Sequence, residues 1–154
     1  MPTDFAPHNL TSPTTPAPYV VTASPGSLGI QFAFDGGPFY CAIANLPCFI
    51  ELDTGFGFSR QLISYSILAP GSDPRLPKAW TVQGSNNNST WTVLDTRTGE
   101  IGWTGSELRS YTCVPGSATA FRYFKLVITD NQASNPTDYT TIAEIYLYGT
   151  GGTD

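Results

Sequence analysis

Charged side chains are scarce in this sequence. Only 12% of its 154 residues are Asp, Glu, Lys or Arg, about half the share typical of globular domains. The seven basic residues are scattered and outnumbered by twelve acidic ones, so they cannot form the basic stripe that phosphate binding needs. We therefore expect no nucleic-acid partner. The sequence also lacks an apolar run of roughly 18 residues, so we expect no membrane insertion.

The residues most often used in catalysis are also few. His8 is the only histidine, and it falls in a proline-rich segment, outside the expected domain. No Ser or Cys stands in a nucleophile-elbow sequence, and no acidic pair stands in a glycosidase-like motif. The three cysteines, Cys41, Cys48 and Cys113, include no CxxC pair, which argues against zinc. Buried, reduced thiols are preferred, with a Cys41–Cys48 disulfide as the alternative. The sequence therefore predicts a protein that is not an enzyme.

Proline is concentrated at the start of the chain. Residues 1–25 contain six prolines among Thr, Ser and Ala, a composition that favours extended backbone. An ordered arm of this kind must lie on its own domain or on a neighbouring subunit. We predict that it serves assembly and contributes little to the fold. The start has no basic region followed by an apolar one, so a secretory leader is not expected.

What the rest of the chain does contain is alternating apolar, β-branched and aromatic residues. They predict strands over Phe49–Asp53, Gln61–Leu68, Ala79–Gln83, Trp91–Leu94, Leu108–Cys113, Phe121–Thr129 and Thr141–Tyr148. Clusters of Gly, Pro, Asn and Asp separate these segments, and no window has a helical period. The pattern favours an all-β sandwich or jelly roll over residues 26–149, followed by a glycine-rich tail at 150–154.

Three stretches between residues 20 and 149 carry a resemblance to a known family. They are Phe34–Gly37 with Ile50–Gly55, Pro77–Asn86 with Thr90–Asp95, and Phe121–Thr129 with Ile142–Gly149. In order and spacing they resemble the discoidin, or coagulation factor 5/8 type C, family of galactose-binding-like domains. The resemblance implies an eight-stranded antiparallel jelly roll. It also implies that loops at one end bind glycans, phospholipid head groups or proteins.

The same resemblance implies a structural calcium ion. Its ligands would be the carboxylates of Asp35 and Glu144 and the backbone carbonyls of Phe32, Gly37 and Ala143, an oxygen set that suits a hard cation. Tyr40 stands where the family often has another hydroxyl ligand, so one expected ligand is missing. The alternative is that Asp35 caps a turn and Glu144 makes a local hydrogen bond.

The expected loops are rich in aromatic and amide side chains. The His, Arg and Asn set of galactose-binding relatives is absent, so galactose recognition does not carry over. The remaining candidates are Phe39, Tyr40, Phe56, Phe58, Arg75, Asn86, Asn87, Asn131, Gln132, Asn135 and Tyr139. Rings and planar donors of this kind suit a sugar site or a protein interface.

Two functions remain. The main interpretation is a bacteriophage virion protein of the tail, fibre or capsid surface, which binds other virion proteins, itself as a homo-oligomer, or a host-surface glycan. It depends on a domain that stands alone after Met1, an uncharged Ser/Thr-rich surface, and an opening at Tyr19–Ser24 that resembles discoidin-like phage proteins. The alternative is an extracellular carbohydrate-binding module of a secreted bacterial glycan-active protein.

Overall fold

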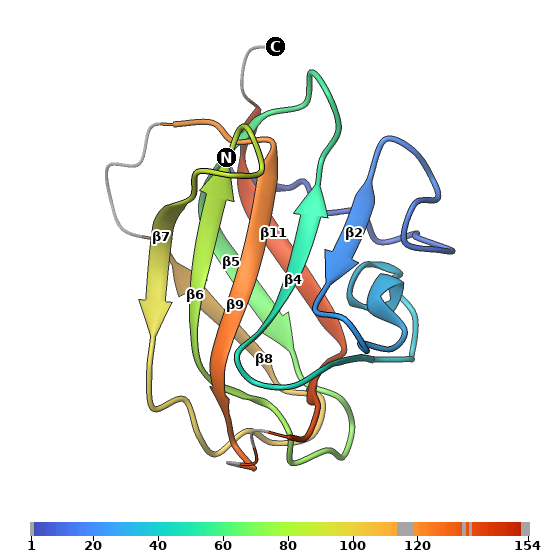
Figure 1. Cartoon of the computed structure of the whole chain (residues 1–154), viewed down its shortest axis with the longest axis vertical. Helices are drawn as coiled ribbons and strands as arrows, with labels where there is room; N and C mark the ends of the chain where they lie inside the picture. The colour runs from blue at the N-terminus through green and yellow to red at the C-terminus, as the bar shows by residue number, and fades with distance from the viewer. Residues whose placement is uncertain (1, 114–118, 134, 136, 152–154) are drawn as a thin grey trace.

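Two antiparallel sheets face each other in the computed structural model (Figure 1). The structure describes residues 2–113, 119–133, 135 and 137–151, which form eleven strands and one short 3-10 helix, η1 (Ile30–Phe34). This confirms the predicted all-β antiparallel sandwich. Within the described residues, no helix is long and apolar enough to cross a membrane.

The first sheet has five strands. In spatial order they are β2 (Val20–Ala23), β4 (Cys48–Asp53), β9 (Tyr123–Asn131), β6 (Pro77–Ser85) and β7 (Thr92–Arg97). The alternation that predicted β9 is that of a strand with one buried face: Phe124, Leu126 and Ile128 enter the core, while Lys125 and Val127 between them stay partly exposed.

The second sheet has four strands, and a small two-stranded sheet lies beside the sandwich. The four are β1 (Thr3–Asp4), β11 (Glu144–Gly151), β5 (Arg60–Leu68) and β8 (Leu108–Thr112); the small sheet joins β3 (Cys41–Ile43) to β10 (Thr140–Ile142). The single strand predicted over Thr141–Tyr148 is therefore broken. At Ala143, whose N–H donates to the Leu68 carbonyl at 2.9 Å, the chain leaves one sheet and enters the other. Strand β11 continues to Gly151, into the predicted tail.

A buried polar chain links the two sheets. The Trp80 indole N–H donates to the Tyr65 hydroxyl at 2.8 Å, and that hydroxyl donates to Asp95 Oδ2 at 2.6 Å. Arg97 Nε donates to the same carboxylate oxygen at 2.9 Å. Because the Trp80 indole and the Tyr65 hydroxyl each have a partner, these two large rings enter the core without leaving a buried donor unpaired.

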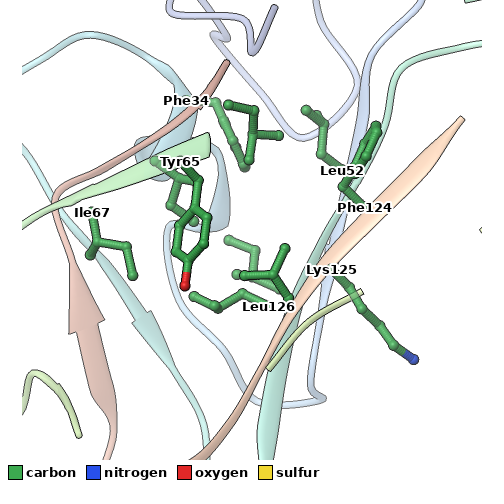
Figure 2. Close-up of a pocket in the computed structure, with 11 residues that line it drawn as sticks. Phe34, Leu52, Tyr65, Ile67, Phe124, Lys125 and Leu126 are labelled. Atoms are coloured by element: carbon green, nitrogen blue, oxygen red, sulfur yellow. The ribbon is translucent and has the colours of Figure 1, made fainter. Parts of the chain in front are cut away.

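The interior is too well filled to hold a ligand. The cavity between the sheets has a volume of about 20 Å³, which is room for no more than about one water molecule. Figure 2 shows Leu52, Phe124 and Leu126 around this space, while the Lys125 amino group points away from it. The hollows wide enough for a ligand that we describe below lie on the loops.

Residues 2–25 differ from the expected arm, because they belong to the fold. Strand β1 pairs with β11, and β2 pairs with β4. The Phe5 N–H donates to the Leu147 carbonyl at 2.8 Å, and the Leu10 and Val21 side chains are buried in the core. Between the two strands the segment turns, with the Thr15 N–H donating to the Ser12 carbonyl at 3.3 Å, and its buried apolar residues belong to the core of the sandwich.

All three cysteines are free thiols in buried positions, which confirms the preferred interpretation over a Cys41–Cys48 disulfide. The Cys41 thiol donates to the Ile142 carbonyl at 3.3 Å. Burial raises the thiol pKa to about 12 for Cys41 and Cys113 and to about 11 for Cys48. The thiols thus stay protonated near neutral pH, which makes them poor nucleophiles.

Candidate functional site

Strand direction sorts the predicted loop residues into two groups at opposite ends of the sandwich (Figure 1). Because Leu68 pairs with Leu108 and Pro77 with Asn131, the connections after β5, β7 and β9 meet at one end. The connections after β4 and β6, and the segment 119–122 before β9, meet at the other. We call these the Arg75 end and the Phe56 end.

A hollow lies at the Arg75 end. Its lining residues come from four segments of the chain: Leu28, Gly29, Phe32, Tyr40, Ala42, Arg75 and Tyr139. Phe32 lies on η1, Tyr40 directly precedes β3, and Tyr139 directly precedes β10. Strands β3 and β10 pair antiparallel, so the two tyrosines flank opposite ends of this short ladder, and both line the hollow.

Two carboxylates hold the Arg75 guanidinium. Nε and Nη2 donate to the two oxygens of Asp73 at 2.9 and 2.7 Å, and Nη1 donates to Asp138 Oδ1 at 3.1 Å. The guanidinium keeps the pKa of the Asp73 carboxyl below its usual value, mainly through these hydrogen bonds. The arrangement fixes the planar guanidinium at the edge of the hollow. Neither Asp73 nor Asp138 was among the site residues predicted from the sequence.

The rings around Arg75 are partly open to solvent. Tyr40 is 43% exposed, Phe39 is 61% exposed, and the Phe39 ring lies 5.3 Å from that of Phe32. Among the described residues, the Tyr40 and Tyr139 side chains have no hydrogen-bond partner. Their hydroxyl groups are therefore available to a ligand. Phe32 contributes a ring here, although the sequence suggested only a carbonyl ligand.

Two predicted ligand residues instead support the loop behind this hollow. Asn131 is fully buried, and its Nδ2 donates to the Tyr139 carbonyl at 3.4 Å and to Thr140 Oγ1 at 3.3 Å. Gln132 Oε1 accepts from the Trp103 N–H at 3.2 Å. These amides position Tyr139 and the neighbouring backbone, and Asn131 is out of a ligand's reach.

The Phe56 end has a second hollow with a different polar lining. Phe56 is 87% exposed and Phe58 is 44% exposed. Arg122 donates to both oxygens of Asp53, at 2.7 and 2.9 Å. Asn86 donates through Nδ2 to the Ala120 carbonyl and accepts through Oδ1 from the Arg122 N–H, both at 3.0 Å. Its amide is therefore already used by the backbone.

Two other predicted amides cap turns. Asn87 Oδ1 accepts from the Ser89 and Thr90 N–H groups at 2.9 and 2.8 Å. Asn135 Oδ1 accepts from the Thr137 N–H at 3.1 Å. These oxygens stabilise local backbone, so the loops offer a ligand fewer free amides than the sequence suggested.

The residues of the expected calcium site make local hydrogen bonds. Asp35 Oδ1 accepts from the Gly37 N–H at 2.8 Å, which closes a turn. Glu144, 2% exposed, accepts from the Gly36 N–H at 3.1 Å. This arrangement corresponds to the alternative interpretation, a turn cap and a local bond. The sequence correctly placed Asp35 and Glu144 in one neighbourhood.

His8 completes that neighbourhood, although it was expected outside the domain. Its Nδ1 lies 2.6 Å from Glu144 Oε1 and its Nε2 lies 2.5 Å from Asp4 Oδ2, and its ring centroid lies 4.7 Å from that of Tyr146, with the ring planes tilted by 34°. Burial alone would lower the His8 pKa, but hydrogen bonds and the charges of the two acids outweigh it and raise the pKa to about 9. The ring is therefore a cation at neutral pH.

These residues do not fit a calcium ion. The Glu144 carboxylate is bound by an imidazolium, and the Asp35 carboxylate is turned toward its own backbone. In the described part of the chain, no group of three or more His, Cys, Asp and Glu side chains is arranged to hold a metal. His8 supplies the positive charge that a buried carboxylate needs.

Solved structures of several carbohydrate-binding modules have a similar architecture. A family 32 module of Clostridium perfringens NanJ, solved with galactose, has a TM-score of 0.66 at 16% identity and covers 84% of this chain and 93% of its own. The fold is that of the galactose-binding-like jelly rolls. The carbohydrate-binding module CBM62 of Clostridium thermocellum Xyl5A has a TM-score of 0.64 at 26% identity. The match covers 85% of this chain and 94% of that module.

A third similar structure is a chitosan-binding module from a chitosanase/glucanase of Paenibacillus sp. IK-5, with a TM-score of 0.62 at 24% identity. The match covers 84% of this chain and 94% of that module. No protein-family model and no curated protein sequence matches the chain. The three structures come from bacterial proteins, and none is described as a virion component. The common fold is the extent of what this likeness shows.

Proposed function

We propose that this chain is a non-catalytic carbohydrate-binding module whose ligand occupies the hollow at the Arg75 end. The observation that carries the proposal is the Arg75 guanidinium, fixed by Asp73 and Asp138 beside the open rings of Tyr40 and Tyr139. A planar donor next to aromatic faces is the combination that distinguishes a sugar site from a simple apolar groove.

Each part of the hollow has a role that suits a sugar ring. The faces of Tyr40 and Phe32 can cover the apolar C–H face of a pyranose, while the phenol hydroxyls and the second oxygen of Asp138 can bond its hydroxyl groups. Arg75 is held before the ligand arrives, so little side-chain entropy is lost on binding. The site is thus largely preformed.

The comparisons support the carbohydrate-binding alternative over the virion interpretation. Modules of the same fold are described in complex with galactose and with a galactose-containing disaccharide. A carbohydrate-binding module of a glycan-active bacterial protein is therefore the better supported form of the proposal. The virion role gains no support from these structures.

A glycan array, followed by titration of the strongest binder, tests the proposal. Tyr40→Ala and Tyr139→Ala should each weaken binding at least about tenfold, because each removes a ring and a hydroxyl. Phe56→Ala is the matched control, since it removes an exposed ring from the opposite end. A parent that binds no saccharide contradicts the function. Loss on Phe56→Ala with none on the tyrosine changes would move the site to the other end.

A further inference from the structure

The charge at the Arg75 hollow is more negative than a single arginine suggests. Asp73 and Asp138 both contact the guanidinium, so two carboxylates surround one cation. The other residues that line the hollow, among them Leu28, Tyr40 and Tyr139, include no Asp, Glu, Lys, Arg or His. The group as a whole therefore carries a net negative charge.

Arg75 already uses part of each edge that could bind a carboxylate. Arginine recognises a carboxylate best through two parallel N–H bonds. Here Nε and Nη2, which form one such pair of donors, are both taken by Asp73, whose side chain is only 6% exposed, and Nη1 of the other pair donates to Asp138. A carboxylate on a sugar would have to displace one of these acids to gain two parallel bonds, whereas single N–H donors remain for a sugar hydroxyl.

Asp138 places its negative charge nearer to solvent. Its side chain is 35% exposed, and Oδ1 accepts from both Arg75 Nη1 and the Tyr139 N–H. Among the described residues, Oδ2 has no hydrogen-bond partner. This oxygen can accept a sugar hydroxyl, but it would repel a carboxylate in the same place.

We infer that the hollow selects uncharged sugar residues and rejects acidic ones such as uronates. The inference rests on the proposed function of the same site. Its physical basis is that Asp73 occupies one carboxylate-binding edge of Arg75, while Asp138 repels an incoming anion. Selectivity of this kind arises from what the site disfavours as much as from what it binds.

Matched sugar pairs test the inference. Galactose and galacturonate oligomers of equal length, and glucose and glucuronate oligomers, differ within each pair only by the carboxylates. Titration at low salt should show the acidic partner bound at least about tenfold more weakly than the neutral one. Raising the salt concentration should reduce this ratio, because screening weakens the repulsion.

Asp138→Asn identifies the cause. The amide keeps an oxygen for Arg75 and for the Tyr139 N–H but removes the negative charge, so the neutral-to-acidic ratio should fall to about threefold or less. Asp53→Asn is the matched control, because it changes an acid that is paired with an arginine at the opposite end. It should leave the ratio as in the parent.

Each outcome separates the inference from the proposed function. If the parent binds acidic and neutral oligomers equally well, the charge selection is wrong and the sugar site stands. The same holds if the preference is unchanged in Asp138→Asn. If neither member of any pair binds, and no saccharide on the array does, the proposed function fails and takes the inference with it.

Discussion

The two ends of the sandwich carry similar residues, yet among the described residues the Arg75 end offers more unpaired polar atoms to a ligand. Each has exposed aromatic rings beside an arginine that a carboxylate holds. At the Arg75 end the rings include tyrosines with open hydroxyls, and an unpaired oxygen of Asp138 remains. At the Phe56 end the rings are phenylalanines, and the Asn86 amide is used by the backbone. Exposure alone therefore does not mark a site.

The ends also differ in how their loops are anchored. At the Arg75 end, the turn that follows η1 is fastened by buried Glu144, which His8 neutralises. At the Phe56 end, the partly exposed Asp53–Arg122 pair links the end of β4 to the segment before β9, nearer to solvent. A buried pair that loses one partner leaves a stranded charge, whereas an exposed pair is replaced by water.

The largest expected effect on stability comes from removing His8, the partner of buried Glu144. His8→Ala should lower the free energy of unfolding by about 2–4 kcal/mol at pH 7, because Glu144 remains buried without a cation. Arg122→Ala, its counterpart at the other end, should cost about 1 kcal/mol or less. Urea unfolding measures both. Equal costs would show that the two anchors do not differ as described.

Alkaline pH should weaken the same anchor reversibly. The His8 pKa is raised from 6.5 to about 9 in the folded protein, so its contribution, up to about 3 kcal/mol, is complete below pH 6.5 and is lost as the pH rises to 9. His8→Gln should flatten this part of the stability profile, whereas Arg122→Ala should keep its shape. A parent profile that is flat between pH 6.5 and 9 would contradict the ion pair.

The arginines should separate the ends by function. Arg75→Ala should weaken saccharide binding at least tenfold, about 1.4 kcal/mol, since it removes the planar donor and frees two acids to repel each other. Arg122→Ala should leave the dissociation constant within about twofold. Calorimetric titration with the best array ligand measures both, and equal losses would disprove the assignment of the sugar to one end.

Smaller effects are expected from the exposed rings of the Phe56 end. Phe56→Ser should change the free energy of unfolding by no more than about 0.5 kcal/mol, because the ring is 87% exposed. Phe58→Ser should cost more, since that ring is only 44% exposed. A large loss from Phe56→Ser in thermal unfolding would mean that the ring packs against the domain.

The smallest effect is expected from calcium. Neither added calcium nor EDTA should shift the midpoint of thermal unfolding, because His8 already neutralises Glu144. The His8→Ala variant, examined under both conditions, is the sensitive comparison. A drop in the midpoint of the parent in EDTA would restore a stabilising ion to this position.

Much of the sandwich could be predicted because one buried face leaves a local signature. Phe124, Leu126 and Ile128 alternate with outward residues, so β9 was recognisable without any tertiary information. Val20 and Val21 carry the same preference in β2, but the surrounding prolines hid it. The break at Ala143 was not predictable either, because both halves of the segment have equal strand character and only their partners differ.

The sequence predicted many residues of the candidate site but not which of them lie together in the structure. Tyr40, Arg75 and Tyr139 were among the loop candidates, as were Phe56 and Asn86, and their residue types do not reveal which end they share. The pairing of Asp73 with Arg75 was weakly predictable, since the two residues are only two positions apart and their side chains can bond locally. The pairing of Asp138 with Arg75 was not predictable, because the two residues are 63 positions apart and meet only in the folded chain.

The sequence by itself determined most of the longer strands, the low share of charged residues and the types of side chain in the loops, because each depends on composition or on neighbours within a few positions. Only the tertiary structure decided which loops meet and which polar atoms remain free. His8 and Glu144 show the reason most clearly, since they lie 136 positions apart. Their contact depends on the path of the whole chain, which makes the N-terminal segment part of the domain.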